Sequence, residues 1–227
     1  MFEGKVIERK GSIEGKNTIS DYTEIEQLNQ RSIFSTVLYT EYMDHKLNVI
    51  DTLGSDDFVG SVITSMYPTD MVVVTINAQY GVEVGTEIFN RHAERLERPI
   101  LIAVNQLDHE KANFEQAMDS LRQTYGTKVL QTQYPLNTGS LFDSFIDVIT
   151  MKMYKFKDDT GIREEFPIPA EEMEKATALH NTLIESAAEN DETLMEKFFE
   201  QGSLSEEEMR KGLSIGVRNR QIFPVFC

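Results

Sequence analysis

The sequence is poor in cysteine and in long apolar runs. Its one cysteine, Cys227, cannot form a disulfide framework, so a reducing compartment is the expected setting. No apolar run approaches the roughly 20 residues that span a bilayer. Residues 1–12 (MFEGKVIERKGS) also lack the long apolar core of a secretory signal. We therefore expect a cytoplasmic protein that does not cross a membrane.

Cations are also scarce. Lys and Arg number 22 against 38 Asp and Glu, which gives a formal net charge of −16. Neutralising the phosphates of DNA or RNA needs clustered cations, so this balance argues against a nucleic-acid clamp and predicts no DNA partner. Residues 158–211 hold sixteen acids and five bases, about two-thirds of the excess. Such a segment suits a basic protein partner, although a solvated helix surface is the simpler explanation.

The chain is long enough for one large domain, or for a domain with a subdomain. Its 227 residues are 40% hydrophobic and 26% charged, as in an ordinary globular protein. Apolar runs alternate with helical spacings over residues 33–133, which predicts an α/β fold whose mostly parallel sheet has helices on both faces. The expected strands are Ile33–Tyr42, Leu47–Thr52, Asp70–Ala78, Ile100–Val104 and Lys128–Gln133. The expected helices are Asp56–Tyr67, Val84–Leu96 and Glu110–Tyr125.

The two ends of the chain lack this regular alternation of strand and helix patterns. Residues 1–32 show weak periodicity, and we interpret them as a short helical tail followed by a long irregular loop. After Pro135 come loop-forming residues, and then a hairpin is expected around the turn Asp158–Gly161. The remaining expected elements are helices over 170–188, 191–200 and 205–217 and a final strand over 221–227. Ser205 and Glu208 have the spacing of a capping box.

Polar residues follow two of the expected strands at the point where each strand ends. The first strand ends in Asp51-Thr52, with Gly54 just beyond, and the second ends in Asn105-Gln106-Leu107-Asp108. In an open α/β sheet, ligands bind at the carboxyl ends of the strands. A carboxylate there can hold the water shell of Mg²⁺, and a glycine can bring its backbone N–H close to a terminal phosphate. Taken alone, this D-x-x-G spacing is weak evidence, and a simple turn after a strand is the more common explanation.

The second strand end narrows the ligand class. An Asp carboxylate accepts two hydrogen bonds from the N1–H and the exocyclic amine of guanine, a donor pair that adenine lacks. Asn105 can brace the base and the neighbouring loops. The two strand ends together therefore predict a guanine nucleotide site formed by Asp51, Gly54, Asn105 and Asp108.

These motifs resemble those of translation elongation factor G and its relatives, and the resemblance covers nearly the whole chain. IDTLGSDDF is similar to the family's IDTPGHVDF, and NQLDHEKANF is similar to NKMDRxGANF. Residues 180–213 resemble the family's helical insert, and RNRQIFPVFC resembles the strand before its last nucleotide motif. The resemblance implies a P-loop NTPase-type translational GTPase fold that binds GTP, GDP and Mg²⁺. It places Asp51 in the water shell of the Mg²⁺ and Thr52, Gly54, Asn105, Gln106 and Asp108 around the nucleotide.

The chain also departs from the family. The phosphate loop G-x-x-x-x-G-K-[ST] occurs nowhere in it, and the resemblance begins just downstream of that loop's place. The resemblance therefore implies a fold incomplete at both ends: a partial GTP-binding domain over 1–134, an insert subdomain of hairpin and acidic helices over 135–220, and a last strand over 221–227. A vacant position in the central sheet should leave an unpaired strand edge and exposed apolar surface, so we expect poor stability or self-association.

Three substitutions within the resembling motifs bear on mechanism. Ser55 stands where the family has the histidine that orients the attacking water, and a shorter, neutral side chain implies that hydrolysis is slow or needs another group. Gln106 replaces a lysine whose stem packs on the base. In the switch-like segment that starts at Arg31, Phe34 stands at the Mg²⁺-binding threonine, so that ligand is lost or supplied by Ser35 or Thr36.

The resemblance implies a fragment of a translation factor that hydrolyses GTP on the ribosome to drive translocation. The full-length parent would be a GTPase, whereas we expect this chain alone to be inactive, because its catalytic position is altered and it lacks the phosphate loop. The alternative is a non-catalytic module, a pseudo-GTPase whose acidic insert binds a basic ribosomal protein. The four histidines are too scattered for a metal site, and we interpret Asp56 and Asp57 as acids favoured by the first turn of a helix.

Overall fold

The computed structural model describes residues 6–7, 11–157 and 162–227. The chain forms two compact units, residues 1–69 and residues 70–227. Each is described by itself. Among the described residues, no helix combines the length and apolar character needed to cross a membrane.

The first unit is built around a two-stranded antiparallel hairpin. Strands β1 (Thr36–Tyr42) and β2 (His45–Asp51) pair from Thr36 opposite Asp51 to Tyr42 opposite His45. Met43 and Asp44 link them with φ of 48° and 60°, the backbone of a two-residue type I′ turn. The two strands expected over Ile33–Tyr42 and Leu47–Thr52 are thus confirmed, and they pair as a hairpin. Helix α1 (Glu24–Asn29) precedes it, and the 3₁₀ turn η1 (Asp56–Phe58) leads into α2 (Val59–Met66).

The second unit contains a four-stranded parallel sheet, called sheet B. Its order is β3 (Val72–Asn77), β4 (Ile100–Asn105), β10 (Phe223–Phe226) and β5 (Val129–Gln131). All three pairings are parallel, and Asn77 lies beside Asn105 in the register. This α/β arrangement, a parallel sheet flanked by helices, confirms the expected fold class. The last strand of the chain inserts between β4 and β5, so the chain returns to the sheet after a long excursion.

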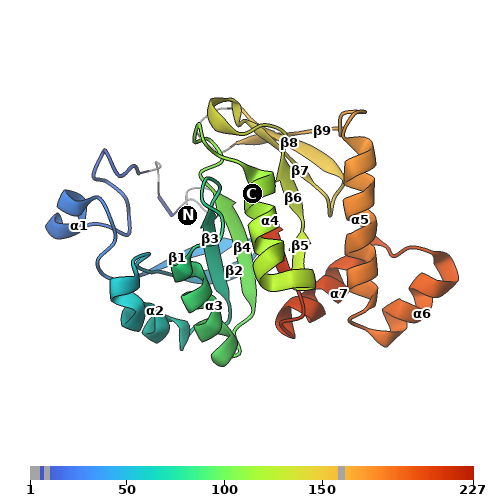
Figure 1. The fold of residues 1–227 in the computed structure, drawn as a ribbon, viewed down its shortest axis with the longest axis horizontal. Coiled ribbons are helices and arrows are strands. Elements are labelled where there is room, and N and C mark those ends of the chain that lie inside the picture. The colour runs from blue at the N-terminus through green and yellow to red at the C-terminus, as the bar shows by residue number, and fades with distance from the viewer. Residues whose placement is uncertain (1–5, 8–10, 158–161) are drawn as a thin grey trace. The chain divides into compact units, whose positions relative to one another are not determined.

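Helices α3 (Val84–Arg95) and α4 (Phe114–Tyr125) cover sheet B (Figure 1). The α4 residues at helical spacing, Phe114, Ala117, Met118 and Leu121, are all buried, as the sequence predicts. They share the core with alternate residues of β4, namely Ile100, Ile102 and Val104. Burying a side chain of this size contributes roughly 1.5–3 kcal/mol, so this layer stabilises the unit. Tyr125 packs edge-on against Phe223 at a centroid distance of 5.8 Å, which joins α4 to the central strand.

A second sheet, sheet C, is antiparallel and consists of β6 (Gln133–Pro135), β7 (Ser144–Asp147), β8 (Lys152–Phe156) and β9 (Arg163–Phe166). A single residue, Thr132, separates β6 from β5 of sheet B. Its backbone N–H and its hydroxyl both donate to the carbonyl of Val225, at 3.0 and 2.6 Å. Its own carbonyl accepts from Val148 N–H at 2.9 Å. Thr132 therefore ties the two sheets together.

Three helices complete the unit: α5 (Met173–Ala188), α6 (Glu192–Gln201) and α7 (Glu206–Arg218). Asp191 caps α6, and Ser205 with Glu208 forms the predicted capping box of α7. Helices α5 and α7 approach closely at Gly212, where an added Cβ would lie 2.3 Å from the carbonyl oxygen of Ala187. Glycine at this position is therefore a packing requirement.

Four expectations need correction or completion. The expected loop over residues 1–32 contains α1. The single strand expected over 128–133 is divided between β5 and β6, because the chain changes sheets at Thr132. Strand β7 was not predicted. The hairpin of β8 and β9 is confirmed by its pairing, whereas its expected turn, 158–161, lies outside the described residues.

Strands β3 and β2 each have an edge with no strand partner among the described residues. Among the described residues, β3 has β4 as its only strand partner and β2 has only β1. Val73 on β3 is 57% exposed and Val49 on β2 is 44% exposed. Apolar side chains therefore accompany both free edges.

Candidate functional site

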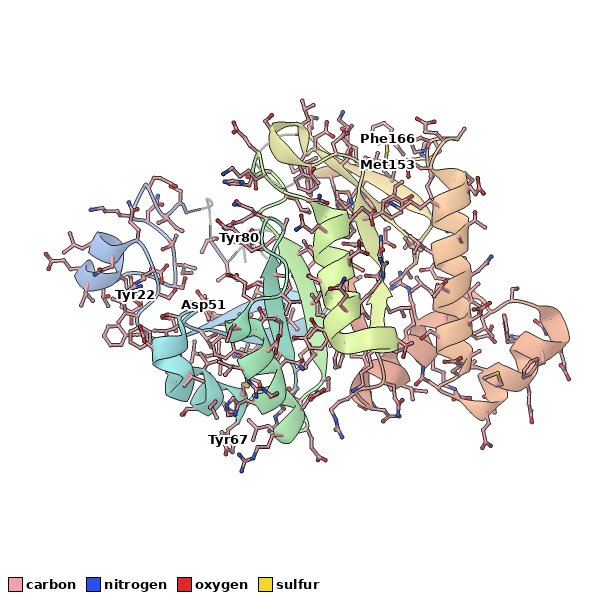
Figure 2. The ribbon with its side chains drawn as sticks, in the orientation of Figure 1. Tyr22, Asp51, Tyr67, Tyr80, Met153 and Phe166 are labelled. Atoms are coloured by element: carbon pink, nitrogen blue, oxygen red, sulfur yellow. The ribbon has the colours of Figure 1, made fainter. Side chains whose placement is uncertain are left out.

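A candidate phosphate-binding strand end lies in the first unit, where β2 ends at Asp51 (Figure 2). Asp51 and Thr52 are half-buried, and Leu53 beside them is 2% exposed. Among the described residues, none donates a hydrogen bond to the Asp51 carboxylate, and none forms an ion pair with it. Gly54 is exposed, and a Cβ added there would meet nothing within 4 Å. Its lack of a side chain therefore leaves room for a ligand to approach the backbone.

Ser55 opens the 3₁₀ turn that follows. Its carbonyl accepts from Phe58 N–H at 3.0 Å, which fixes the start of η1. The half-buried Ser55 hydroxyl can donate or accept a hydrogen bond, but at neutral pH it cannot carry a charge as an imidazole can. This position can therefore orient a water molecule only by a neutral hydrogen bond.

The switch-like segment is held by Glu26, a residue that was not predicted as part of the site. Glu26 is 1% exposed, and its Oε1 accepts from the backbone N–H groups of Ile33 and Phe34, both at 3.1 Å. Its Oε2 accepts from the hydroxyl of Thr23 at 2.6 Å and from the Thr23 N–H at 3.2 Å. Burial alone would raise the pKa of Glu26, but these hydrogen bonds lower it below its ordinary value. The carboxylate thus ties α1 to the start of β1.

The side chains of the switch-like segment do not gather around Asp51. Phe34 is 55% exposed, and Arg31 is exposed. The hydroxyl of Ser35 lies 3.1 Å from those of Ser61 and Ser65 on α2, so it belongs to a serine cluster on that helix. Thr36, the other substitute ligand, donates its hydroxyl to the Ser20 carbonyl at 3.0 Å. Both candidate replacements for a metal-binding threonine are therefore already engaged.

The candidate base-binding loop, Asn105 to Asp108, lies in the second unit at the carboxyl end of β4. It is anchored from two sides: Ala78 N–H donates to the Asn105 carbonyl at 3.0 Å, and Gly139 N–H donates to the Leu107 carbonyl at 2.7 Å. Leu107 is 3% exposed, whereas the Asn105 and Asp108 side chains are exposed. The loop thus inserts one apolar side chain into the core and presents its polar side chains outward.

Gln106 has an unusual backbone. Its φ is 59°, in the left-handed region, where a residue with a Cβ costs roughly 1–2 kcal/mol. Its side-chain Oε1 accepts from Asn77 Nδ2 at 2.7 Å. Gln106 therefore has a partner on the neighbouring strand, and neither Asn77 nor Gly139 was singled out from the sequence. The capping-box spacing of Thr23 and Glu26 was a readable sequence signal for the first unit, whereas Asn77 and Gly139 carry no such signal.

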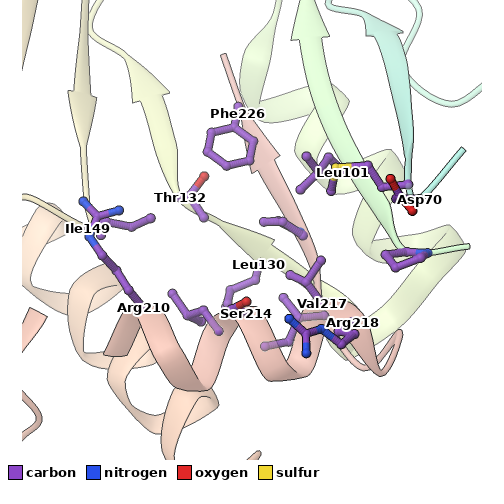
Figure 3. Close-up of a pocket in the computed structure, with 15 residues that line it drawn as sticks. Asp70, Leu101, Leu130, Thr132, Ile149, Arg210, Ser214, Val217, Arg218 and Phe226 are labelled. Atoms are coloured by element: carbon purple, nitrogen blue, oxygen red, sulfur yellow. The ribbon is translucent and has the colours of Figure 1, made fainter. Parts of the chain in front are cut away.

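A separate apolar groove of about 420 Å³ runs along sheet B (Figure 3). Leu101, Leu130 and Phe226 line it from the sheet, and Leu213 and Val217 line it from α7. Leu101 alternates with the buried Ile100 and Ile102, so the groove lies on the opposite face from that core. Its lining includes none of the Asn105–Asp108 residues. The groove is thus distinct from the candidate site.

Among the described residues, no cluster of three or more His, Cys, Asp or Glu side chains could hold a metal ion by itself. A nucleotide-bound Mg²⁺ does not need such a cluster, since that ion keeps several waters and takes one or two carboxylates plus phosphate oxygens. The free Asp51 carboxylate fits that requirement.

Residues 1–200 match the model of a family described as the elongation factor Tu GTP-binding domain. A protein from Thermus thermophilus, known from its crystal structure, is 30% identical and superposes with a TM-score of 0.90. The match covers 99% of this chain and 33% of that protein, so the chain spans about one third of its length.

Proposed function

Since the chain belongs to the family of the elongation factor Tu GTP-binding domain, we propose that it is the nucleotide-binding part of an elongation-factor-G-like factor that works in the cytoplasm on the ribosome. The family assignment gives a translational GTPase-type GTP-binding domain and implies a guanine nucleotide as ligand. The proposal adds the ribosome as partner, GTP hydrolysis as reaction and translocation as its use.

The observation that carries the proposal is the anchored loop at the end of β4. Backbone bonds from Ala78 and Gly139 hold it in place and leave the Asp108 carboxylate outward-facing and exposed. A carboxylate in this position can accept from both the N1–H and the exocyclic amine of guanine. Asn105, exposed beside it, can brace the base, and the stem of Gln106 can pack on it.

The first unit would serve the phosphates. Asp51 would hold Mg²⁺ through water, Thr52 would lie beside it, and Gly54 would offer its backbone N–H to the γ-phosphate. The metal, when bound, neutralises charge on the phosphate oxygens. Ser55 would position the attacking water by a neutral hydrogen bond, so hydrolysis is expected to be slow.

The division of the chain remains a proposal too. Residues 1–134 and 221–227 would form the GTP-binding part, and residues 135–220 would form the insert. The return of β10 between β4 and β5 supports the assignment of the last segment to the GTP-binding sheet.

A titration with three nucleotides tests the ligand. The chain should bind GDP with micromolar or tighter affinity in calorimetry and bind ADP at least tenfold more weakly. Asp108→Asn should lose GDP and gain xanthosine diphosphate, because xanthine presents a carbonyl where guanine presents its amine. Asp119→Asn on α4, also an exposed acid, is the matched control and should change neither affinity. Equal affinity for GDP and ADP would contradict the proposal.

One specific observation supports the alternative function, a non-catalytic pseudo-GTPase module. Phe34 has no metal-binding oxygen, and the hydroxyls of Ser35 and Thr36 are engaged elsewhere. GDP binding with no measurable phosphate release from GTP, in the presence of ribosomes and Mg²⁺, would favour this alternative.

A further inference from the structure

The base-binding loop has one weak point, Gln106. The residues on either side are anchored through their backbone carbonyls, Asn105 by Ala78 and Leu107 by Gly139. Gln106 lies between them in the left-handed conformation, and its own carbonyl accepts only a turn bond from the nearby His109 N–H at 3.1 Å. Among the described residues, the one hydrogen-bond partner of the Gln106 side chain is the side chain of Asn77.

The orientation of Asn77 is determined by its surroundings. Its Oδ1 accepts from the backbone N–H of Gln79 at 2.8 Å, and a backbone N–H can only donate. The Nδ2 group of Asn77 must therefore face Gln106, and Gln106 must present its oxygen, Oε1, at 2.7 Å. The half-buried Asn77 sits at the end of β3, directly beside Asn105 in the parallel register. The contact thus joins two neighbouring strand ends through one pair of amides.

The pair also depends on the kind of residue at position 106. A lysine there brings only donors, which cannot pair with the Nδ2 donor that Asn77 directs at position 106. Glutamine brings an acceptor, Oε1, for the Nδ2 donor of Asn77. The two side chains are therefore chemically matched to each other.

We propose that Asn77 is a positioning residue for guanine nucleotide binding, which holds Gln106 and thereby the conformation of the Asn105–Asp108 loop. This role rests on the proposed function, because it assigns the loop to the base. Asn77 acts through Gln106 and needs no contact with the nucleotide.

The test combines hydrogen exchange on the nucleotide-free chain with GDP titration. Asn77→Ala and Gln106→Ala should each speed exchange of a peptide covering residues 103–109 and weaken GDP binding about fivefold to tenfold, the loss expected for one hydrogen bond. The double variant should exchange no faster and bind GDP no more weakly than the more impaired of the two single variants, because both changes remove the same contact. Gln106→Lys should behave like Gln106→Ala in the exchange measurement.

Thr75→Ala is the matched control, since Thr75 is two residues earlier on β3 and exposed. It should leave both exchange and affinity at the wild-type values. Additive losses in the double variant, or unchanged exchange in Asn77→Ala, would overturn the positioning role. A wild-type chain that binds no guanine nucleotide would refute the proposed function and, with it, the assignment to nucleotide binding. The exchange data would then still decide whether Asn77 holds the loop.

Discussion

The carboxylate of Glu26 accepts a hydrogen bond from the backbone N–H of Phe34, eight residues further along the chain, over 3.1 Å. The same carboxylate accepts from Ile33 and from Thr23, so a single buried acid closes both the N-terminus of α1 and the start of the hairpin. A buried carboxylate is costly unless its oxygens are satisfied, and here they are. The conformation of the switch-like segment thus depends on one ionised group.

Glu26→Gln should open this segment. An amide has the same size but presents one NH₂ group, which would face either the N–H of Thr23 or those of Ile33 and Phe34. An unmatched buried donor costs roughly 1–3 kcal/mol, so exchange at residues 31–36 should become faster. Glu24→Gln, an exposed acid of the same helix, should leave exchange unchanged. Equal protection in both variants would show that Glu26 does not hold the segment.

The same segment should loosen in acid. The pKa of Glu26 is lower in the folded chain than in the unfolded chain, so its stabilisation is complete above the ordinary value of 4.5. That stabilisation is lost as the pH falls through the lower, folded value. Exchange at residues 31–36, corrected for its intrinsic pH dependence, should accelerate only below about pH 4.5. The Glu26→Gln variant should lack this acceleration.

Gly139→Ala should disturb the base-binding loop from its second anchor. Gly139 has a φ of 76°, so alanine would be strained by roughly 1–2 kcal/mol and would shift the N–H that holds Leu107. GDP affinity should fall, and exchange at residues 103–109 should rise. Gly202→Ala at the end of α6 is the control, since its φ of 72° imposes similar strain far along the chain. A fall in GDP affinity in both variants would indicate general destabilisation.

Gly212→Ala should destabilise the helical insert. The added methyl would lie 2.3 Å from the Ala187 carbonyl oxygen, so α5 and α7 must separate, at a cost of about 1–3 kcal/mol. Gly60→Ala in α2 adds the same methyl where nothing lies within 4 Å, and should stabilise by about 0.5–1 kcal/mol through helix propensity. Chemical denaturation followed by circular dichroism should therefore give shifts of opposite sign. Shifts of the same sign would argue against tight helix packing.

The insert should also lose stability in acid. The side chain of Lys197, together with the hydroxyl and N–H of Ser205, lowers the pKa of Glu208 to about 2. The Thr193 hydroxyl, Lys211 and the Leu194 N–H lower the pKa of Asp191 to about 2. Both groups stabilise the fold above their ordinary values near 4 and lose this effect between about pH 4.5 and pH 2.

Helical circular dichroism should fall across this interval. The double variant Asp191→Asn, Glu208→Gln should be less stable than the wild type near neutral pH, and its stability should depend less on pH. Glu192→Gln and Glu207→Gln, exposed neighbours in the same first turns, should retain the wild-type pH dependence. A wild-type signal that stays constant to pH 2 would contradict the assignment.

Much of the fold could be predicted because periodicity and capping are local properties. The burial of Phe114, Met118 and Leu121 on α4 and the capping box at Ser205 both follow from spacing alone. Where the prediction was wrong, the cause was non-local. The chain changes sheets at Thr132, which donates to Val225, 93 residues away, and accepts from Val148, and no local pattern shows such partners.

The candidate site divides in the same way. Strand-end residues such as Asp51 and Asp108 were predicted from the sequence because a strand that ends in a carboxylate is visible there. Asn77 and Gly139 were missed, since each contributes a contact to a loop that lies distant in sequence. The identity of a ligand-facing residue can thus be read more easily than that of the residues behind it.

The single-residue junction at Thr132 has a mechanical consequence. A hinge needs a few residues that can change φ and ψ, but here Thr132 is bonded at its N–H, its hydroxyl and its carbonyl. Sheet C therefore cannot swing freely on β5, and a torque applied to it would be transmitted directly to β5 and β10. We therefore expect sheets B and C to move together as one rigid body.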